Sequence, residues 1–439
     1  MPKYEPEGLA TRESIDPEDY VITTFHIRTQ EPDLLHIVEG LSIEQTTGTW
    51  IRVPRETDEV RRQFLGKTLG FYRTPGPDYT NIIAQIGFPM ANFLPSVAHL
   101  MAAIAGNIFY VKNTAVRILD VQFPKSFVAP FKGPKFGVEG VRKLLKAKER
   151  PLTLTMIKPC VGLETSVFAE QCYESAAGGI DIIKDDELME SPCNCLLEDR
   201  ITAVMEAIDK AESETGEKTL YTINISDDGH RTLENAEKMV EMGANALHIN
   251  FLATGFTILR DVAEDPSVKV PVLAHPAGAG MWYRGMHGFN YPTIAKFVRL
   301  CGGDMYILPT SHGKLFQPYF DEITSGLNSR ASFYHIKANW PIIGGGVYPG
   351  MIPVNLHELG TDIVLGAGGG VHAHPNGSID GAKAMRQAVD LYMQGGDFEN
   401  IPKDMKELQL AVDKWGTYLK PKVEGFTTEI QPEFGWDGC

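Results

Sequence analysis

The sequence lacks any long apolar run. No stretch of its 439 residues approaches the roughly 18 consecutive apolar residues that a membrane-spanning helix needs. The opening residues, MPKYEPEGLATRES, carry charges and have no apolar centre of the kind that a secretory signal requires. We therefore expect a cytoplasmic protein with no membrane partner.

Cysteine and positive charge are also scarce. The 6 cysteines show no paired spacing of the metal-binding type, which favours a reducing compartment. Lysine and arginine number 41 against 56 acidic residues, and the formal net charge of -15 repels the phosphate backbone of nucleic acids. These shortages favour a small-molecule partner and exclude nucleic acid.

The remaining composition is that of an ordinary globular protein, with 43% hydrophobic and 22% charged residues. The chain is long enough for a barrel of about 250 residues together with a second domain of about 100–150. The segment FKGPKF, Phe131–Phe136, contains glycine and proline and reads as a linker. We predict an N-terminal α+β domain over residues 1–134 and a second domain over 135–439.

The second domain alternates short apolar runs with amphipathic helical patterns. The candidate strands are Thr153–Lys158, Ile180–Lys184, Leu220–Ile225, Ala246–Asn250, Val270–Ala274, Met305–Leu308, Pro341–Ile343 and Asp362–Leu365. Parallel strands with crossover helices close more readily into a barrel than into an open sheet, because closure removes the edges. The pattern predicts an α/β fold, a (β/α)8 TIM barrel followed by C-terminal helices, with a doubly wound open sheet as the alternative.

The first domain reads as a small antiparallel sheet with two helices, an α+β arrangement of the ferredoxin-like kind. Its expected strands are Tyr20–Arg28, Thr49–Val53, Tyr79–Gly87 and Ala115–Gln122. Its expected helices are Pro32–Leu41 and Leu94–Ile104.

Acidic residues follow the second barrel strand. Lys184 and Asp186 are two residues apart and share a strand face, and Glu187 follows where the strand yields to a loop. Two carboxylates suit a hard cation with oxygen ligands. A charged lysine cannot bind a metal, but the carbamate that CO₂ forms with its neutral amine is an anionic oxygen donor. We hypothesise a Mg²⁺ site made by these three residues, against the alternative of a surface charge cluster.

Glycine clusters follow the last two strands, where barrels commonly bind a phosphate. They contain Gly345 and Gly346 after the seventh strand and Gly368 and Gly369 after the eighth. Turn geometry alone is the alternative explanation. Lys314, in a glycine-flanked loop after the sixth strand, has the setting of a lid residue.

These motifs together resemble the large subunit of RuBisCO over nearly the whole chain. GGIDIIKDDE is similar to the carbamylated-lysine motif, which implies that Lys184 takes up CO₂ and binds one Mg²⁺ with Asp186 and Glu187. Further similar stretches are TMIKP with Lys158, EQTTGTW with Glu44, Thr49 and Trp50, AGN with Asn107, LAHP with His275, and HGKL with Lys314.

The resemblance implies a role for each matched residue. Lys158 would shuttle protons, and the other catalytic residues would be Lys184, His275, Lys314, Asn107 and Glu44. Thr49 and Trp50 would bind substrate phosphate together with Gly345, Gly346, Gly368 and Gly369. The residues from the first domain would serve the site of a neighbouring subunit, so the resemblance implies a homodimer with shared active sites, or a larger homo-oligomer.

Four departures from the family pattern shape the functional prediction. Cys160 replaces the second lysine of a KPK stretch, while Pro276, Ile307 and Gly344 replace an arginine, a histidine and a serine that hold a second substrate phosphate in the family. A phosphate dianion without partners costs several kcal/mol to desolvate. We therefore expect a RuBisCO-like protein that acts on a singly phosphorylated keto-sugar and is not a true carboxylase.

Several reactions through an enediolate remain open. Lys314 and Asn107 face the added carboxyl group in the family, so their retention favours cleavage or decarboxylation of a β-keto acid sugar phosphate such as 3-oxo-isoapionate 4-phosphate. The alternative is a methionine-salvage enolase or isomerase of a methylthio-ketose 1-phosphate, which GGVYPGMIP and GAGGGVHAHPNG resemble, although its base lysine is Asn107 here. A non-catalytic sugar-phosphate binder is the third hypothesis.

Overall fold

The computed structural model of the chain describes residues 8–49 and 51–422. Two compact units divide the chain. The first, called the sheet unit here, comprises the residues up to Phe131 together with Gly278–Phe297. The second, the barrel unit, comprises Lys132–Ala277 and the residues from Val298 onward. That residue 134 ends an independent domain stays a prediction.

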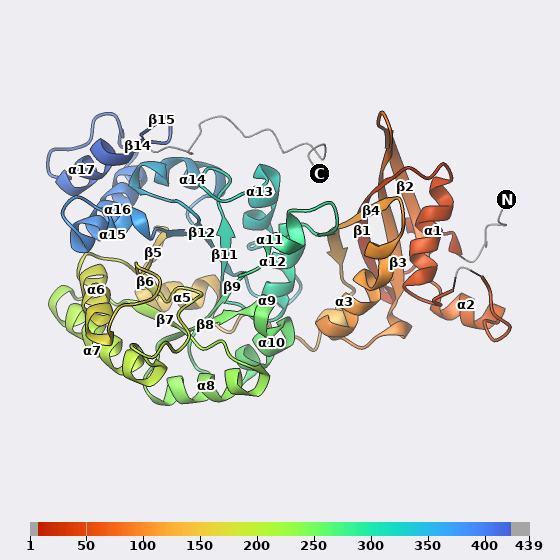
Figure 1. The fold of residues 1–439 in the computed structure, drawn as a ribbon, viewed down its shortest axis with the longest axis horizontal. Coiled ribbons are helices and arrows are strands. Elements are labelled where there is room, and N and C mark those ends of the chain that lie inside the picture. Colours follow the sequence, from red (N-terminus) through yellow and green to blue (C-terminus); the bar gives the residue numbers. More distant parts are fainter. Residues whose placement is uncertain (1–7, 50, 423–439) are drawn as a thin grey trace. The chain divides into compact units, whose positions relative to one another are not determined.

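The barrel unit is built on a closed ring of eight parallel strands (Figure 1). In chain order they are β5 (Leu152–Met156), β6 (Ile182–Lys184), β7 (Leu220–Asn224), β8 (Ala246–Asn250), β9 (Val272–His275), β11 (Met305–Pro309), β12 (Trp340–Gly344) and β13 (Val364–Gly366). Pairing of β13 with β5 closes the ring. The predicted TIM barrel is confirmed, and the open sheet is excluded.

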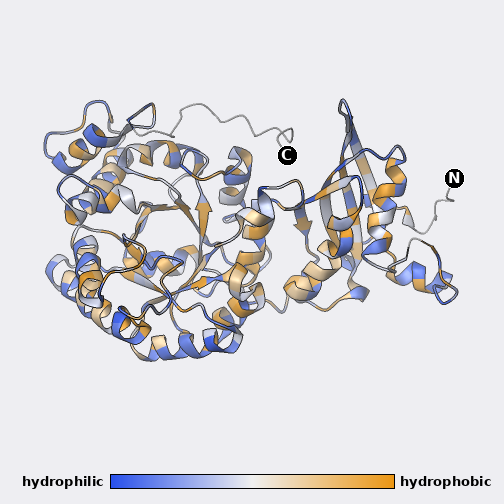
Figure 2. Cartoon of the chain, viewed as in Figure 1, coloured by the Kyte–Doolittle hydropathy of each residue, from blue (hydrophilic) through white to orange (hydrophobic). Residues whose placement is uncertain are grey.

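Helices surround this ring and turn their polar faces outward (Figure 2). The longer ones are α6 (Thr165–Ala177), α7 (Leu197–Thr215), α8 (Gly229–Glu241), α10 (Phe256–Glu264), α13 (Tyr319–Asn328), α14 (Ile352–Leu359), α16 (Ser378–Met393) and α17 (Lys406–Trp415). Shorter elements are α9 (Phe251–Thr254), α15 (Gly369–His372), η6 (Pro349–Met351), β14 (Gly416–Thr417) and β15 (Lys420–Pro421). None of the helices within residues 8–49 and 51–422 is long and apolar enough to span a membrane.

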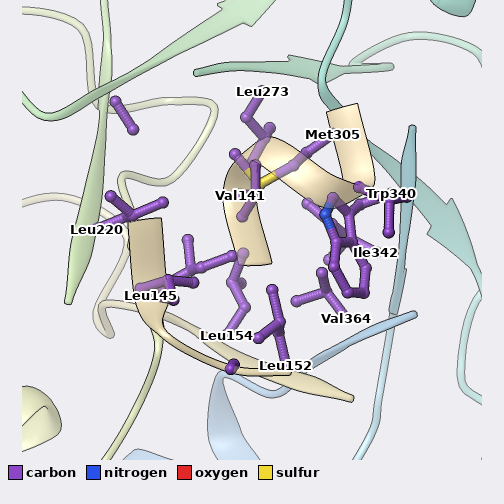
Figure 3. Packing of buried hydrophobic residues seen from close by; sticks show 14 of the residues in the cluster. Val141, Leu145, Leu152, Leu154, Leu220, Leu273, Met305, Trp340, Ile342 and Val364 are labelled. Atoms are coloured by element: carbon purple, nitrogen blue, oxygen red, sulfur yellow. The ribbon is translucent and has the colours of Figure 1, made fainter. Parts of the chain in front are cut away.

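Helix α5 (Gly137–Leu145) packs against the barrel core. Val141 and Leu145 meet strand residues such as Leu154 and Trp340 in one buried apolar cluster (Figure 3). The buried carboxylate of Asp304, just before β11, accepts hydrogen bonds from the backbone N–H groups of Phe136 and Gly137, both at 2.7 Å, and of Val272 at 2.9 Å. One side chain thus fixes the start of α5 to the base of the barrel.

The sheet unit has a five-stranded sheet of order β10-β4-β1-β3-β2. Its strands are β1 (Tyr20–Thr29), β2 (Lys67–Pro75), β3 (Thr80–Pro89), β4 (Thr114–Gln122) and β10 (Gly288–Phe289). Its helices are α1 (Leu34–Glu44), α2 (Asp58–Phe64), α3 (Val97–Ala105), α4 (Lys125–Val128) and α11 (Gly280–Tyr283), and α12 (Tyr291–Leu300) begins in this unit. The short helices are η2 (Arg12–Ser14), η3 (Pro17–Asp19), η4 (Met90–Asn92) and η5 (Asn107–Tyr110).

The expected α+β character of this unit is confirmed, but one of its strands was placed wrongly. Residues 49 and 51–53 lie in no strand, and the sheet instead contains β2. From Gly70 onward the residues of β2 are exposed, so the strand has no alternation between buried and exposed positions. A second difference is β10, which pairs in parallel with β4 although it lies between two barrel strands in the sequence.

Substitution of Asp304 tests whether this side chain holds the start of α5 at the base of the barrel. Asp304→Ala removes the acceptor of three buried N–H groups, and we expect the barrel unit to lose about 3 kcal/mol of stability, with a smaller loss for Asp304→Asn, which keeps one oxygen. Calorimetric melting at one fixed scan rate measures the change. Asp209→Ala, at an exposed position of α7, is the control and should melt like the unchanged protein. Equal melting of Asp304→Ala and this control would contradict the assignment.

Candidate active site

Lys184 is the last residue of β6, and its amine is buried at the carboxyl end of the barrel. Its Nζ lies 3.6 Å from Glu187 Oε2 and donates a hydrogen bond to the carbonyl oxygen of Asp185 at 2.5 Å. Burial lowers the pKa of Lys184, and this effect outweighs the nearby charges of Glu187, Asp186 and Asp185. Burial therefore makes the neutral amine, the form that can react with CO₂, easier to reach than it is in an exposed lysine.

Asp186 is held by the loop that follows β5. Lys158 lies two residues beyond the end of that strand, and its Nζ donates a hydrogen bond to Asp186 Oδ2 at 2.6 Å and another to Cys160 Sγ at 2.8 Å. Burial alone would raise the pKa of Asp186, but hydrogen bonds from Lys158 and Cys160 lower it to about 2. Burial would lower the pKa of Lys158, but its own hydrogen bonds to Asp186 and Cys160 raise it. The pair is therefore an ammonium ion and a carboxylate at neutral pH.

Glu187 is fixed through both its backbone and its side chain. Its carbonyl oxygen accepts hydrogen bonds from Asn224 Nδ2 at 3.3 Å and from Asn250 Nδ2 at 3.0 Å. Its Oε2 lies 3.4 Å from Nε2 of His275, the last residue of β9. Burial, followed by the charge of Lys184, holds the pKa of His275 well below its ordinary value, so a neutral imidazole faces this carboxylate.

A second histidine, His248 of β8, lies directly beside the first. The ring centroids of His248 and His275 are 5.4 Å apart, and His248 Nε2 lies 3.2 Å from Asn250 Oδ1. Burial and the charge of Lys184 also hold the pKa of His248 well below its ordinary value. Within the described part of the chain, the buried Nδ1 atoms of both rings have no hydrogen-bond partner.

Asp185 points away from this cluster into a buried network. Its carboxylate lies 3.1 Å from Arg200 Nη2 and accepts hydrogen bonds from Tyr221 Oη at 2.5 Å and from the backbone N–H of Asn224 at 2.9 Å. Arg200 also donates to three carbonyl oxygens of the loop that carries the other two carboxylates, those of residues 189, 190 and 195. This network fixes the loop on which Asp186 and Glu187 stand.

Sequence reasoning missed Asn224, Asn250, His248 and Arg200. Asn224 and Asn250 are the last residues of β7 and β8, so the same inspection of strand ends that singled out Lys184 would have found them. Arg200 sits on α7 and reaches Asp185 only through the tertiary fold, so no local pattern indicates it.

The glycine clusters lie in two different backbone settings. Gly345 and Gly346 have φ angles of 93° and 119°, which favour glycine for conformational reasons alone. A Cβ on Gly368 would contact Lys158 Cε at 3.1 Å, whereas one on Gly369 would meet nothing within 4 Å. The backbone at Gly345 and Gly346 thus requires glycine whether or not a ligand binds, and at Gly369 a Cβ would meet no neighbouring atom. That these glycines bind phosphate stays a prediction.

Lys314 is exposed in the loop that follows β11. Its backbone N–H donates to the carbonyl oxygen of Gly345 at 2.8 Å, so this loop rests on the turn after β12. Of the positions where the family pattern is lost, Ile307 is part of the buried apolar cluster of the barrel, and Gly344 ends β12. The side chain of Ile307 is apolar and Gly344 has none, so neither position supplies a side-chain donor to a phosphate.

The remaining predicted residues belong to the sheet unit. Asn107 Nδ2 donates to Glu44 Oε1 at 3.2 Å, so the structure brings these two predicted catalytic residues together. Thr49 Oγ1 donates to the carbonyl oxygen of Ile51 at 2.7 Å. Trp50 lies outside the described residues.

The residues around Lys184 can be tested against the implied metal. Within residues 8–49 and 51–422, no three His, Cys, Asp or Glu side chains are grouped so that they could hold an ion. Asp186 and Glu187 supply two carboxylates, and a carbamate on the buried Lys184 amine would complete a set of three anionic oxygen donors. This donor set fits Mg²⁺, provided that Lys184 carries CO₂.

Comparison with known proteins identifies the class to which this barrel and its rim belong. The model of the ribulose bisphosphate carboxylase large chain catalytic domain matches residues 137–415, and that of its N-terminal domain matches residues 11–127. The chain therefore belongs to the family of RuBisCO large chains.

Individual relatives include proteins of different activities. A ribulose bisphosphate carboxylase-like protein of Archaeoglobus fulgidus is 44% identical over 429 residues, covering 93% of this chain and 97% of that protein. A 2,3-diketo-5-methylthiopentyl-1-phosphate enolase of Bacillus cytotoxicus is 30% identical over 407 residues, covering 90% and 97%. The structure of octameric ribulose-1,5-bisphosphate carboxylase/oxygenase of Pyrococcus horikoshii superposes with a TM-score of 0.86 at 30% identity, covering 93% and 96%.

The buried network beneath the rim gives a second prediction. Arg200→Met removes the cationic partner of the buried Asp185 carboxylate, which keeps its hydrogen bonds from Tyr221 and the N–H of Asn224, and the donor to three carbonyl oxygens. We expect a loss of about 3–5 kcal/mol of stability. Thermal unfolding monitored by calorimetry measures this loss. Arg231→Met removes an exposed arginine that lies 4.0 Å from Asp227, and should change the melting temperature little. A small effect of Arg200→Met as well would show that the network does not hold the loop.

Proposed function

We propose that this chain is a Mg²⁺-dependent enzyme that forms the enediolate of a singly phosphorylated keto-sugar. The reaction we favour is the decarboxylation or cleavage of a β-keto acid sugar phosphate such as 3-oxo-isoapionate 4-phosphate. The observation that carries the proposal is the buried Lys184 amine, whose pKa is lowered and which lies 3.6 Å from Glu187.

Lys184 as a carbamate, Asp186 and Glu187 would hold one Mg²⁺. When bound, the ion supplies Lewis-acid stabilisation of negative charge on neighbouring substrate oxygens. Lys158 donates a hydrogen bond to Asp186 in this structure. For Asp186 to bind the ion, Lys158 would give up this hydrogen bond and donate to the substrate instead. Lys158 would then hold an acidic proton at its Nζ beside the reacting carbon.

The other residues of the rim would bind and orient the substrate. His275, neutral and beside Glu187, can donate or accept one hydrogen bond from a substrate hydroxyl without adding charge. The exposed ammonium group of Lys314 would bind the carboxylate, and the open backbone at Gly369 would accept the single phosphate.

Glu44 and Asn107 would complete the site of a neighbouring subunit in a homodimer or a larger homo-oligomer. Their mutual hydrogen bond supports a shared function within the sheet unit. The similarity to an octameric ribulose-1,5-bisphosphate carboxylase/oxygenase also favours an oligomer.

An enolase or isomerase reaction is the second candidate. The similarity to a 2,3-diketo-5-methylthiopentyl-1-phosphate enolase favours it. In this reaction, the carbamate of Lys184 would serve as the base. Against it stands Asn107, which cannot act as a base at the position of the enolase lysine. Product analysis after incubation with each substrate class separates the two reactions, and release of CO₂ identifies the first.

Carbamate formation tests the metal site directly. With ¹³C-labelled bicarbonate and Mg²⁺, we expect a protein-bound carbamate signal in the ¹³C NMR spectrum, because burial favours the neutral amine. Lys184→Met should abolish the signal and turnover, while Lys210→Ala, at an exposed position of α7, should keep both. Turnover by Lys184→Met without Mg²⁺ would refute the proposal.

The phosphate site can be tested by calorimetric titration with a keto-sugar monophosphate and the corresponding bisphosphate. The bisphosphate should bind about tenfold more weakly or worse, because its second phosphate loses water without gaining partners. Gly369→Ala adds a methyl group in open space and should weaken monophosphate binding without affecting stability. Gly229→Ala, where a Cβ also meets nothing within 4 Å, is the matched control. Tighter binding of the bisphosphate would disprove a single phosphate site.

A further inference from the structure

The loop of residues 310–318, between β11 and α13, contains an inward-facing histidine two residues before Lys314. The side chain of His312 is only 8% exposed, and its Nε2 lies 2.7 Å from Glu358 Oε2 on α14. Lys314 is exposed by contrast. The loop thus has one residue available to a ligand and another bound to the body of the barrel unit.

Side chains from three segments face the His312 ring. Glu358 comes from α14, and Glu322 and Tyr319 come from the first turn of α13. Tyr418, in the short connection between β14 and β15, packs edge-on against the ring with centroids 4.8 Å apart. The ring of Tyr319 lies 6.1 Å away. Two acidic groups and no basic side chain therefore face this imidazole in the described part of the chain.

Hydrogen bonds join the same loop to its neighbours. The buried carboxylate of Glu322 accepts from the backbone N–H of Ser311 at 2.7 Å. The N–H of Thr310 donates to the carbonyl oxygen of Gly344 at 2.9 Å, as the N–H of Lys314 does to that of Gly345 at 2.8 Å. The position of Lys314 is thereby coupled to the turn after β12.

Gly313 makes this close packing possible. A Cβ there would lie 2.3 Å from the carbonyl oxygen of Gly345, a distance that requires the backbone to shift. The loop can therefore lie this close to the turn at Gly345 only because residue 313 has no side chain. Residues 310–312 and Glu358 supply the polar contacts that keep it there.

We propose that His312 is a positioning residue, which clamps the Lys314 loop onto the turn at Gly344 and Gly345 through its ion pair with Glu358. What Lys314 does once it is positioned rests on the proposed function; the clamp itself does not. Protonated His312 donates a charge-assisted hydrogen bond to a carboxylate in a site largely shielded from water, where such a bond is strongest.

The clamp depends on pH in a defined direction. Burial lowers the pKa of His312, but the hydrogen bond and charge of Glu358, with the charge of Glu322, outweigh it and raise the pKa above its ordinary value of 6.5. The contribution of the charged imidazole is therefore complete below pH 6.5 and is lost as the pH rises through the raised pKa. The loop should open more readily in alkaline solution.

Hydrogen–deuterium exchange of the full-length protein tests this inference without a substrate. Exchange of a peptide spanning residues 310–316, corrected for the intrinsic pH dependence of the chemistry, should be about tenfold faster near pH 9 than near pH 6, since a charged hydrogen bond is lost. In His312→Gln the same peptide should exchange fast at both pH values. His357→Gln, which alters an exposed histidine next to Glu358 on the same helix, should behave like the unchanged protein.

Glu358→Gln is an independent test that changes the acidic partner of His312. It keeps a hydrogen-bond acceptor and should reduce the pH dependence without unfolding α14, which calorimetry verifies. Exchange that does not change with pH in the unchanged protein would overturn the proposal. So would equal exchange in His312→Gln and His357→Gln. A carbamate signal at Lys184 with unaltered loop exchange would leave the proposed function standing and reject only the clamp.

Discussion

The removal of water from the amine of Lys184 is the constraint on which the rest of the rim depends. An ammonium group in this place costs free energy, and three nearby carboxylates do not restore its ordinary pKa. The sequence places this lysine at the end of a strand, where the closed barrel buries it on all sides. The same burial that makes the amine costly as a cation makes it available as a nucleophile toward CO₂.

Repulsion among the three consecutive acidic residues is limited because two of them have a cationic partner and the third, Glu187, is partly exposed to water. Asp185 turns into the barrel wall and meets Arg200, Asp186 meets Lys158, and Glu187 faces His275. The first contact is structural, since it holds the loop, and the other two lie at the rim. This division explains why a run of like charges is stable here, and it separates a residue that supports the site from two that can act within it.

The barrel and the central motif could be predicted because local signals determine them. All eight predicted strands overlap observed ones, since short apolar runs alternating with amphipathic helices are a local pattern. The end of the first strand was predicted two residues too late: β5 stops at Met156, so Lys158 stands in a loop. Strand β2 could not be predicted because its outer part is exposed and shows no alternation. The pairing of His312 with Glu358 joins residues far apart in sequence, and only the fold reveals it.

The parallel pairing of β10 with β4 carries a consequence for the architecture of the chain. Residues 278–297 lie between the barrel strands β9 and β11 in the sequence but belong to the sheet unit. The two units are therefore interleaved along the polypeptide, and a single cut near residue 131 cannot separate them cleanly. An N-terminal fragment ending there would leave β4 with an unpaired edge open to association with other chains. Transfer of the sheet unit of this chain to another protein must therefore carry over two separate segments of sequence.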